Sequence, residues 1–364
     1  MDPVRLAIDV GPLYGHRTGI GAAIAELVPA LDAHPGVELL PYLLSFRTRP
    51  QPPARRLPLP AALAHRLWAR SDTPRVDRWL RAAEVVHGTN YVVPPSRLPA
   101  LVSVYDCWFL ANPDLASPDV RRAGDVLRRR VAAGATVHAS SHATAAQLDE
   151  LLGARDVEVV HLGPLPVEEP PARASAPWIT DLAGRPYVLA LGTVERRKNL
   201  PALAAAFASA AVDGAALVIA GASGDDAAAL DHTIERLPAD VRARVIRPGS
   251  ITVGEKAWLL HHADLLAYPS LDEGFGFPIL EAQTVGVPVV ATRAGSIPEV
   301  AGDGAELVPV GDDDALAAAI TRVLDDDGRR AELVAAGHQN VARFSWTATA
   351  EALVGVYRRL VERA

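Results

Sequence analysis

The sequence predicts an α/β protein with two doubly wound, parallel-sheet domains that face a central cleft. The chain has 364 residues, enough for two domains with separate hydrophobic cores. Short apolar segments alternate with alanine-rich helical segments along most of its length, which is typical of parallel sheets covered by helices. One segment, Gly163–Trp178, is rich in Pro, Glu and Ala without apolar periodicity, and it divides the alternation into two series.

Each series contains six predicted strands. Those of the first series are Leu6–Val10, Glu38–Leu44, Val85–Gly88, Leu101–Tyr105, Val137–Ala139 and Val157–His161. Those of the second are Tyr187–Leu191, Leu217–Ala220, Val245–Arg247, Leu265–Tyr268, Val289–Thr292 and Glu306–Val308. We therefore expect domains at residues 1–165 and 186–343, joined by a linker at 166–185. A final helix is expected within 344–364, and ligands are expected at the carboxyl ends of the strands.

Composition restricts the class of protein. A net charge of −7 argues against general nucleic-acid binding. The single cysteine, Cys107, excludes an internal disulfide and a thiolate metal cluster. The N-terminus runs straight into a strand without a signal segment, and no apolar run approaches the roughly 20 residues that span a bilayer. We expect a cytoplasmic protein. Lysine is rare: Lys198 and Lys256 are its only occurrences, and the other basic side chains, histidines aside, are arginines.

The most informative motif follows the predicted strand Leu265–Tyr268. Glu273 and Glu281 lie eight positions apart around a Gly-Phe-Gly loop, and a helix is predicted at Ile279–Val285. Glycines allow the positive φ angles of such a loop, and the helix start attracts an anion. Two acids beside an anion site suggest hydroxyl recognition, with a sugar on one side and a ribose on the other. The alternative is a solvated Asp-Glu turn followed by an amphipathic helix.

This segment resembles the E-x7-E motif of retaining glycosyltransferases of family 4, which implies a GT-B fold with two Rossmann-like domains. The resemblance implies that Glu273 contacts the donor sugar and that Glu281 holds the ribose hydroxyls. The loop and helix start are implied to face the sugar and diphosphate, through Gly274, Phe275, Gly276, Ile279 and Leu280. In that family the C-terminal helix returns to the first domain, which is what we expect of residues 344–364.

A second motif, Gly192-Thr193-Val-Glu-Arg-Arg197-Lys198-Asn199, follows a predicted strand and opens a helix. It is similar to the family's Gly-Thr-x-Glu-x-Arg-Lys-Asn segment, whose Arg and Lys bind the donor diphosphate. Fixed cations in a closed site stabilise the charge that develops on a leaving diphosphate. We expect Arg197 and Lys198 to act in this way and Asn199 to cap the helix. The alternative for Lys198 is an exposed residue at a helix start.

A third motif, Thr18-Gly19-Ile-Gly21, resembles the family loop that approaches the donor's phosphate and sugar. Ile24 takes the place of the third glycine of a dinucleotide fingerprint, so a nicotinamide site is weakly supported. The chain departs from the family by having Ala22-Ala23 where relatives commonly have Arg-Tyr.

The fourth motif, Tyr105-Asp106, stands where the family usually has His-Asp, with the His near the donor sugar. A tyrosine can donate one hydrogen bond but is no base near neutral pH. Either the histidine is not a general base, or Tyr105 compensates for it, or activity is reduced. His87, near the end of the predicted strand Val85–Gly88, is either a core histidine or a site residue, and Asp106 is either a site residue or a helix cap.

Metal and membrane sites receive less support. The acidic runs Asp312–Asp314 and Asp325–Asp327 are predicted at helix ends, where acids are usually solvated. We expect a metal-independent enzyme. His65–Arg81 contains Trp68, Trp79 and several arginines and is compatible with a basic amphipathic helix at the inner face of an anionic membrane. The alternative is an ordinary solvated helix face.

The resemblance implies a retaining transferase that moves a hexosyl unit from a GDP- or UDP-linked sugar to a hydroxyl. The acceptor would be a glycan, a lipid-linked molecule or a small molecule. Two other hypotheses stay open: a sugar-nucleotide-binding protein with little or no turnover, suggested by Tyr105, and a GT-B sugar-nucleotide epimerase.

Overall fold

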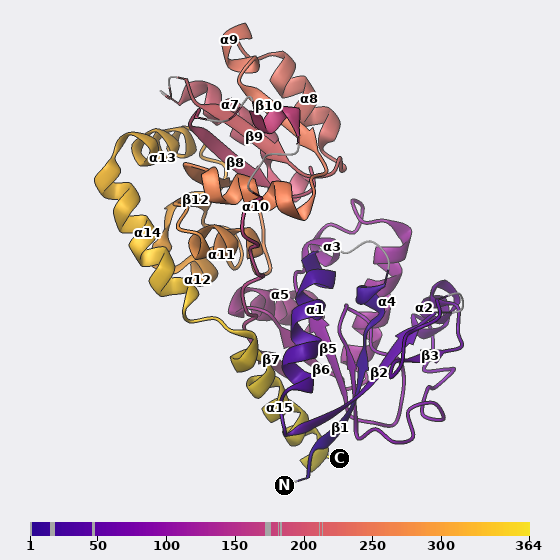
Figure 1. Ribbon diagram of the computed structural model, residues 1–364. Helices are drawn as coiled ribbons and strands as arrows, with labels where there is room; N and C mark the ends of the chain where they lie inside the picture. The colour runs from indigo at the N-terminus through magenta and orange to yellow at the C-terminus, as the bar shows by residue number, and fades with distance from the viewer. Residues whose placement is uncertain are drawn as a thin grey trace. The chain divides into compact units, whose positions relative to one another are not determined.

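The computed structural model describes residues 2–14, 19–45, 48–171, 176–180, 182, 184–210, 212 and 214–364. The chain forms two compact units (Figure 1). The first combines Met1–Gly163 with Phe344–Ala364, and the second is Pro164–Arg343. Each unit is a parallel sheet with helices on its faces.

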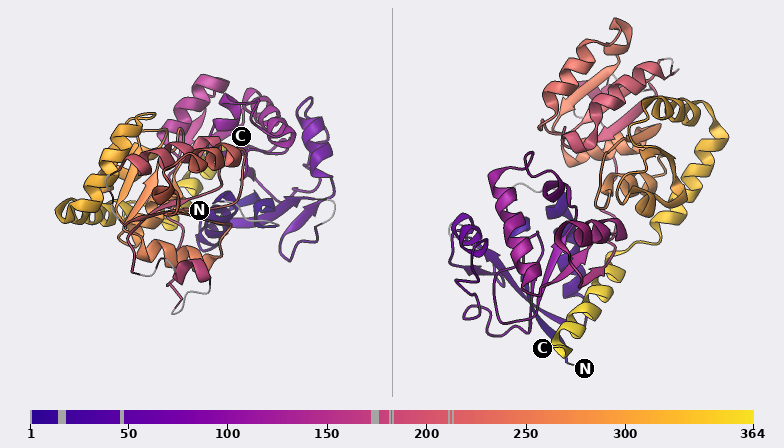
Figure 2. Two further views of the ribbon diagram at one scale, coloured as in Figure 1. Left: turned by 90° about the horizontal axis from the view of Figure 1, so that it is seen from above. Right: turned by 180° about the vertical axis from the view of Figure 1, so that it is seen from behind.

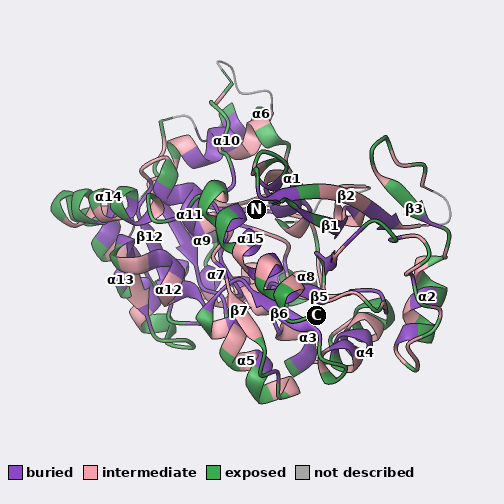
Figure 3. Cartoon of the chain, turned by 90° about the horizontal axis from the view of Figure 1, so that it is seen from below, coloured by how far each residue is buried: buried purple, intermediate pink, exposed green. Residues whose placement is uncertain are grey.

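In the described residues the first unit has a seven-stranded parallel sheet of order β3-β2-β1-β4-β5-β6-β7. Its strands are β1 (Val4–Asp9), β2 (Val37–Leu44), β3 (Arg55–Leu57), β4 (Val85–Gly88), β5 (Ala100–Val104), β6 (Thr136–Ala139) and β7 (Val157–Val159). Its helices are η1 (Gly11–Leu13), α1 (Gly19–Asp32), α2 (Ala61–Trp68), α3 (Trp108–Ala111), α4 (Pro118–Ala132), α5 (His142–Leu152) and α15 (Trp346–Glu362). The central strands β4, β5 and β6 are buried along their whole length, as expected of a parallel sheet covered on both faces (Figure 3).

The last helix, α15, belongs to the first unit. It packs against α1 and lies along the first unit (Figure 2). Leu353 and Tyr357 on its inner stripe have no exposed surface. Thr349 Oγ1 donates a hydrogen bond of 2.8 Å to the main-chain oxygen of His161. Gly163 lies so close to the start of α15 that a Cβ there would come within 2.6 Å of Trp346. The end of the first long segment and the start of α15 are therefore held together.

In the described residues the second unit has a six-stranded parallel sheet of order β10-β9-β8-β11-β12-β13. Its strands are β8 (Tyr187–Leu191), β9 (Ala216–Ala220), β10 (Val245–Gly249), β11 (Leu265–Tyr268), β12 (Val289–Thr292) and β13 (Ala305–Val308). Its helices are α6 (Pro177–Thr180), η2 (Arg196–Lys198), α7 (Leu200–Ser209), α8 (Ala227–Glu235), α9 (Ala239–Arg242), α10 (Val253–His262), α11 (Phe277–Thr284), α12 (Ile297–Ala301), η3 (Gly302–Gly304), α13 (Asp313–Asp325) and α14 (Asp327–Val341).

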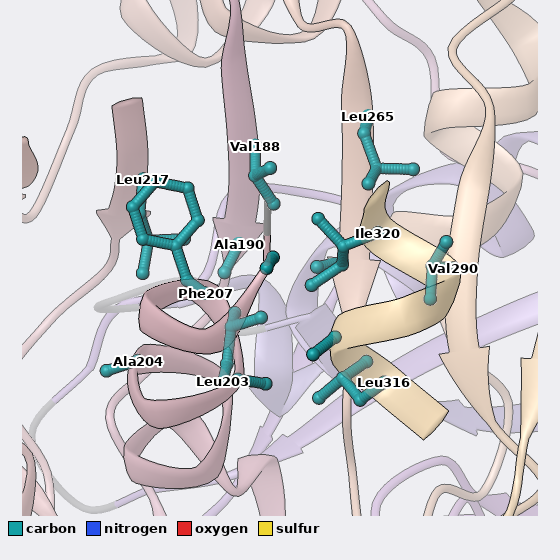
Figure 4. Close-up of a cluster of buried hydrophobic side chains, with 14 of the residues drawn as sticks. Val188, Ala190, Leu203, Ala204, Phe207, Leu217, Leu265, Val290, Leu316 and Ile320 are labelled. Carbon is teal, nitrogen blue, oxygen red and sulfur yellow. The ribbon is translucent and has the colours of Figure 1, made fainter. Parts of the chain in front are cut away.

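One core of the second unit lies between its sheet and two helices. Phe207 of α7 and Ile320 of α13 pack toward Val188 and Leu217 on the strands, and all four side chains are fully buried (Figure 4). Burial of a large apolar side chain contributes about 1.5–3 kcal/mol relative to exposure. This packing fixes the strands, and with them the loops that leave their carboxyl ends.

All twelve predicted strands are present, with ends that differ from the prediction by at most two residues. The sequence analysis missed β3, a three-residue edge strand paired with Tyr42–Leu44, because two of its residues are exposed arginines. Within the predicted linker 166–185, Ile179 and Leu182 are buried in the second unit's core. Residues 172–175, 181 and 183 of that segment lie outside the described residues.

Residues His65–Arg81, considered above as a basic amphipathic helix or an ordinary solvated helix, do not form one continuous helix. Helix α2 ends at Trp68, and turns follow it. Trp68 is 1% exposed, and its indole N–H donates to the main-chain oxygen of Pro74 over 3.0 Å, so it packs into the core instead of facing outward. No helix in the described residues has the length and apolar character needed to span a bilayer.

The two sheets share a topological feature that locates candidate sites. The strand order reverses between β1 and β4 in the first unit and between β8 and β11 in the second. In open α/β sheets, ligands bind beyond the carboxyl ends of the strands at such a reversal. We call these two places the first and second switch points.

Candidate functional site

Three side chains predicted as catalytic meet at the second switch point. Arg197 and Lys198 lie in η2, in the loop after β8, and Glu273 lies in the loop after β11. Lys198 Nζ donates to Glu273 Oε1 over 2.6 Å, and Arg197 Nη1 donates to Oε2 over 2.5 Å. Ser270 Oγ also donates to Oε1, over 2.8 Å. The three charged side chains are between 6% and 15% exposed, so one buried carboxylate holds two nearly buried cations.

The ionisation of this cluster is set by its charges. Burial alone would raise the pKa of Glu273, but the positive charges of Lys198 and Arg197 outweigh burial and hold it at about 2. Burial lowers the pKa of Lys198, while Glu273 acts in the opposite direction. With Glu273 ionised and both cations protonated, the buried trio carries one excess positive charge. Glu195 at its rim, 43% exposed and 3.7 Å from Arg197, balances part of it.

The loops around Lys198 fix its position. Its ammonium donates to the Tyr268 hydroxyl over 2.7 Å and lies 4.6 Å from the centre of that ring. Gly192 has φ of 137°, which side chains rarely tolerate, and a Cβ there would lie 3.4 Å from Lys198 Cε. Thr193, next to it, is half-buried. The lysine stem therefore lies against the backbone at the end of β8.

The glycine-rich loop leads into α11 as predicted. Gly276, with φ of 100°, is the residue before the helix, and Pro278 lies in the first turn. Gly274, Phe275, Ile279 and Leu280 are buried beside the loop and along the helix start. Glu281, one turn into α11, is 1% exposed and forms an ion pair with Lys256 of α10, whose side chain is 35% exposed. Each glutamate of the motif is thus paired with one of the chain's two lysines.

Some site features were missed or misassigned from sequence. Asn199 precedes α7 but makes no capping hydrogen bond through its side chain. It adopts a left-handed conformation with φ of 51°, which turns the chain from η2 into α7. Ser296 anchors the loop, since its N–H donates to the main-chain oxygen of Glu273 and its hydroxyl donates to that of Phe275. Lys256 was also missed as a partner of Glu281, although the rarity of lysine was a usable signal.

In the first unit, Asp106 is already engaged. Its Oδ2 accepts a hydrogen bond of 3.1 Å from the Tyr91 hydroxyl, and its Oδ1 accepts one of 3.1 Å from the Trp108 N–H. Tyr105 is 7% exposed, and burial raises the pKa of its hydroxyl above the usual value. Gly19 and Gly21 open α1, with Gly19 exposed and Gly21 buried. Thr18, which precedes them in the predicted loop, lies outside the described residues.

His87 is a core residue. Its Nδ1 bonds to the Tyr357 hydroxyl and its Nε2 to Ser103 Oγ, both over 2.8 Å. Ser103 bonds in turn to Nδ1 of His138, whose Nε2 bonds to the main-chain oxygen of Val160. A carbonyl only accepts, so His138 carries its proton on Nε2, Ser103 donates to His138, His87 donates to Ser103, and Tyr357 donates to His87. Burial lowers the pKa of His87 to about 3 and that of His138 to about 4.

Comparison with known proteins bears on the second unit most directly. Residues 177–340 match the family described as glycosyl transferases, group 1. O-antigen chain mannosyltransferase B of Escherichia coli is 34% identical over 182 residues, which are 49% of this chain and 47% of that protein. D-inositol 3-phosphate glycosyltransferase of Xylanimonas cellulosilytica is 32% identical over 267 residues, which are 70% of this chain and 63% of that protein. The alignments thus span about half to two thirds of these curated relatives.

Solved structures match over the whole chain. Sucrose-phosphate synthase from Thermosynechococcus elongatus has a TM-score of 0.76 at 21% identity and covers 99% of this chain and 100% of its own. HepE of Anabaena in complex with UDP-glucose has a TM-score of 0.71 at 17% identity, and the match covers 98% of this chain and 99% of the HepE chain. At these identities the likeness concerns the fold. It confirms the predicted GT-B class, with two Rossmann-like parallel-sheet domains.

Proposed function

We propose that this protein is a retaining glycosyltransferase that moves a hexosyl unit from a nucleoside-diphosphate sugar to a hydroxyl acceptor. The observation that carries the proposal is the buried trio of Arg197, Lys198 and Glu273 at the second switch point. A buried excess positive charge there is suited to a diphosphate, and it is already in place when the sugar–phosphate bond breaks. The match of residues 177–340 to a glycosyl transferase family supports the same reaction class.

The proposed roles follow from the resemblance and from the contacts. Arg197 and Lys198 stabilise the leaving diphosphate, and Glu273 orients the donor sugar while keeping the two cations in place. Glu281 receives the ribose hydroxyls, with Lys256 beside it. In a retaining transfer the acceptor approaches from the leaving-group face, and a diphosphate oxygen takes the acceptor's proton. Such a reaction requires no enzymic nucleophile. We propose that it also requires no metal, so chelation with EDTA should leave the rate unchanged.

The donor class is tested by thermal unfolding in the presence of UDP-, GDP-, ADP- and dTDP-sugars. A ligand at 100 times its dissociation constant stabilises by about 2.7 kcal/mol, a readily measured shift. We expect one nucleotide series to stabilise the wild type and to lose this effect in Lys198→Ala and Glu281→Ala. Arg236→Ala, an exposed arginine of the same unit, is the control and should respond like the wild type. Absence of any nucleotide-dependent shift in the wild type would contradict the proposal.

The acceptor is proposed only as a class: a glycan, a lipid-linked molecule or a small molecule. Contact with an anionic membrane is a separate proposal, for the outer face of α2. There Leu63 and Leu67 are 49% and 41% exposed beside Arg66 and Arg70. Exposed leucines next to arginines suit an interface with anionic lipid. The wild type should co-sediment with vesicles that contain phosphatidylglycerol, and the double variant Leu63→Ser, Leu67→Ser should remain in the supernatant.

A sugar-nucleotide-binding protein without turnover is the second candidate. It is favoured by Tyr105, a buried phenol whose raised pKa makes it unable to accept a proton at neutral pH. The two candidates differ in one assay. After prolonged incubation with the stabilising nucleotide sugar, a transferase releases free nucleoside diphosphate by transfer or slow hydrolysis, whereas a binding protein releases none. A GT-B epimerase would instead convert the donor into a second nucleotide sugar.

A further inference from the structure

Tyr268 is the last residue of β11 and lies at the second switch point, beside Lys198. Its side chain is 2% exposed. Its hydroxyl accepts a hydrogen bond of 2.7 Å from Lys198 Nζ, and the same Nζ lies over its ring, 4.6 Å from the ring centre. The roles proposed above for Lys198 and Glu273 give this tyrosine no part. Any effect of Tyr268 on a bound ligand would pass through Lys198.

The hydroxyl of Tyr268 is a neutral acceptor. Burial raises its pKa well above the ordinary value of 10.0, and the negative charge of Glu273 raises it further. A neutral oxygen holds the ammonium of Lys198 without cancelling its charge. With a second carboxylate in its place, two cations would face two carboxylates, and the excess positive charge of the buried trio would be lost.

The ammonium of Lys198 is held at two of its three N–H groups. Among the described residues its acceptors are Glu273 Oε1, at 2.6 Å, and the Tyr268 hydroxyl, at 2.7 Å. The three N–H groups of an ammonium have a tetrahedral arrangement, so two fixed hydrogen bonds also fix the direction of the third. With one acceptor alone, the flexible lysine side chain could pivot about the remaining hydrogen bond.

A ligand has room next to this ammonium. Gly192 ends the turn of chain after β8, and a Cβ added to it would lie 4.0 Å from Lys198 Nζ. Apart from the chain neighbours of Gly192, the described atoms within 4 Å of such a Cβ all belong to the Lys198 side chain. Glycine therefore leaves open a space that any side chain would fill. The Lys198 side chain is 12% exposed, so it is not sealed inside the core.

We propose that Tyr268 is a positioning residue for Lys198. Its hydroxyl and Glu273 hold two N–H groups of the ammonium, and the third is thereby kept in place for an oxygen of an anionic ligand. That this oxygen belongs to the diphosphate of a nucleotide sugar rests on the proposed function. A donor that is fixed before the ligand arrives stabilises charge developing on the leaving diphosphate better than a mobile one.

The variant Tyr268→Phe tests the proposal, since it removes the hydroxyl and keeps the ring beside the ammonium. The probe is inorganic pyrophosphate, which carries the diphosphate without base or sugar, and its binding is measured by isothermal titration calorimetry. We expect Tyr268→Phe to bind pyrophosphate about tenfold more weakly than the wild type, because one hydrogen bond no longer holds the charged donor in place.

Tyr187→Phe is the matched control for this measurement. It also removes a buried hydroxyl from the second unit, one that donates to the main-chain oxygen of Leu259 over 2.7 Å. Tyr187 is the first residue of β8, whereas Lys198 follows the carboxyl end of that strand. This variant should bind pyrophosphate like the wild type. Circular dichroism checks that both variants are folded.

Lys198 can also be observed directly, because Lys198 and Lys256 are the only lysines of the chain. In protein made with isotopically labelled lysine, NMR gives one side-chain signal for each, and Lys256→Arg identifies that of Lys198. We expect pyrophosphate to shift the Lys198 signal of the wild type. Burial already lowers the pKa of Lys198, and loss of an acceptor favours the neutral amine further, so its pKa should be lower in Tyr268→Phe than in the wild type and the control. The other charged groups that face the ammonium are the same in all three proteins: Glu273, Arg197 and Glu195.

The outcomes distinguish this inference from the proposed function. Weaker pyrophosphate binding together with a lower Lys198 pKa in Tyr268→Phe supports the inference. If the wild type then releases no nucleoside diphosphate from any nucleotide sugar, the positioning role stands and the transferase proposal fails. If Tyr268→Phe equals the wild type in pyrophosphate affinity, or binds more weakly without a change at Lys198, the inference is overturned and the proposed function is untouched. A wild-type Lys198 signal that pyrophosphate leaves unchanged also overturns the inference.

Discussion

Glu273 and Asp9 are carboxylates at the switch points of two parallel sheets whose strand order reverses in the same way. Their electrostatic surroundings differ: one carboxylate is paired with cations and the other is not. Glu273 accepts hydrogen bonds from two cations and a serine, and its pKa is held at about 2. Asp9 accepts one main-chain hydrogen bond among the described residues, and its pKa is raised to about 6. The fold thus positions a carboxylate at each switch point. The neighbouring side chains decide whether ionisation of that carboxylate stabilises or destabilises the folded protein.

The first prediction concerns Glu273, where we expect the largest effect. In Glu273→Ala, the buried Arg197 and Lys198 lose their counter-charge, and breaking a buried pair in this way costs about 3–5 kcal/mol. Urea unfolding measures the loss. Glu195→Ala is the control, because that carboxylate is 43% exposed and should cost less than about 1 kcal/mol. An equal loss of unfolding free energy in Glu273→Ala and Glu195→Ala would contradict the view that Glu273 is the essential counter-charge of the two cations.

The same contrast predicts a dependence on pH. Because the folded pKa of Glu273 lies below its ordinary value of 4.5, the stability it contributes is complete above pH 4.5 and is lost as the pH falls toward 2. The difference in unfolding free energy between wild type and Glu273→Gln should therefore shrink across this window. A constant difference from pH 5 to pH 2 would show that the carboxylate is not held in its ionised form.

The second prediction concerns the neutral polar chain through His87 in the first unit. Tyr357→Phe removes the hydroxyl that donates to His87 Nδ1 and leaves a buried acceptor without a donor, at a cost of about 2 kcal/mol. Chemical unfolding checks the value. Tyr187→Phe, which loses a hydroxyl bonded to the main-chain oxygen of Leu259 in the second unit, is the matched control and should cost about 1 kcal/mol.

The third prediction has the opposite sign. Because burial raises the pKa of Asp9, its ionisation opposes folding, and Asp9→Asn should be more stable than the wild type at pH 7. The full shift corresponds to about 3 kcal/mol, and partial contact with solvent reduces the expected gain to about 1–2 kcal/mol. The gain should be absent below pH 3.8 and complete above pH 6. Thermal unfolding at several pH values decides the matter, and a destabilised Asp9→Asn at pH 7 would contradict it.

The smallest effect is expected at Glu281. Its partner Lys256 is 35% exposed, so Lys256→Ala should cost only about 1 kcal/mol, which is less than loss of a fully buried partner would cost. Lys256→Arg keeps a cation and should recover most of this loss. We also expect Lys256→Ala to weaken nucleotide binding several-fold by calorimetry. If it is as destabilising as Glu273→Ala, the two glutamates are equivalent after all.

The sequence predicted the second unit better than the first for physical reasons. Continuous apolar runs such as Val289–Thr292 identify buried parallel strands, and the groups that bind a diphosphate are cations at short spacing, as in Arg197-Lys198. Contacts between residues far apart in sequence leave no such local signal. The pairing of Lys256 with Glu281, 25 positions away, depends on how the fold brings α10 and α11 near each other.

The first unit shows the same limitation more strongly. In the sequence, Asp9 is an ordinary acid at the end of a predicted strand. Only its burial in the fold, which raises its pKa, distinguishes it from other acids. Trp68 and the arginines near it are compatible with an amphipathic helix. The structure differs because the chain turns after α2 and buries the indole, and the local sequence does not show that turn. The roles given to Tyr105, Asp106, Gly19 and Gly21 came from the resemblance and stay predictions.

The placement of α15 has a consequence for how the protein is made. The second unit is one uninterrupted stretch, Pro164–Arg343, whereas the first lacks α15 until residues 344–364 leave the ribosome. Most of the first unit is translated before the second, but folding of the first unit is completed only after the whole of the second has been translated. A premature stop codon shortly after position 343 would therefore leave the first unit without α15, although the second unit, which directly precedes the stop in sequence, would be complete.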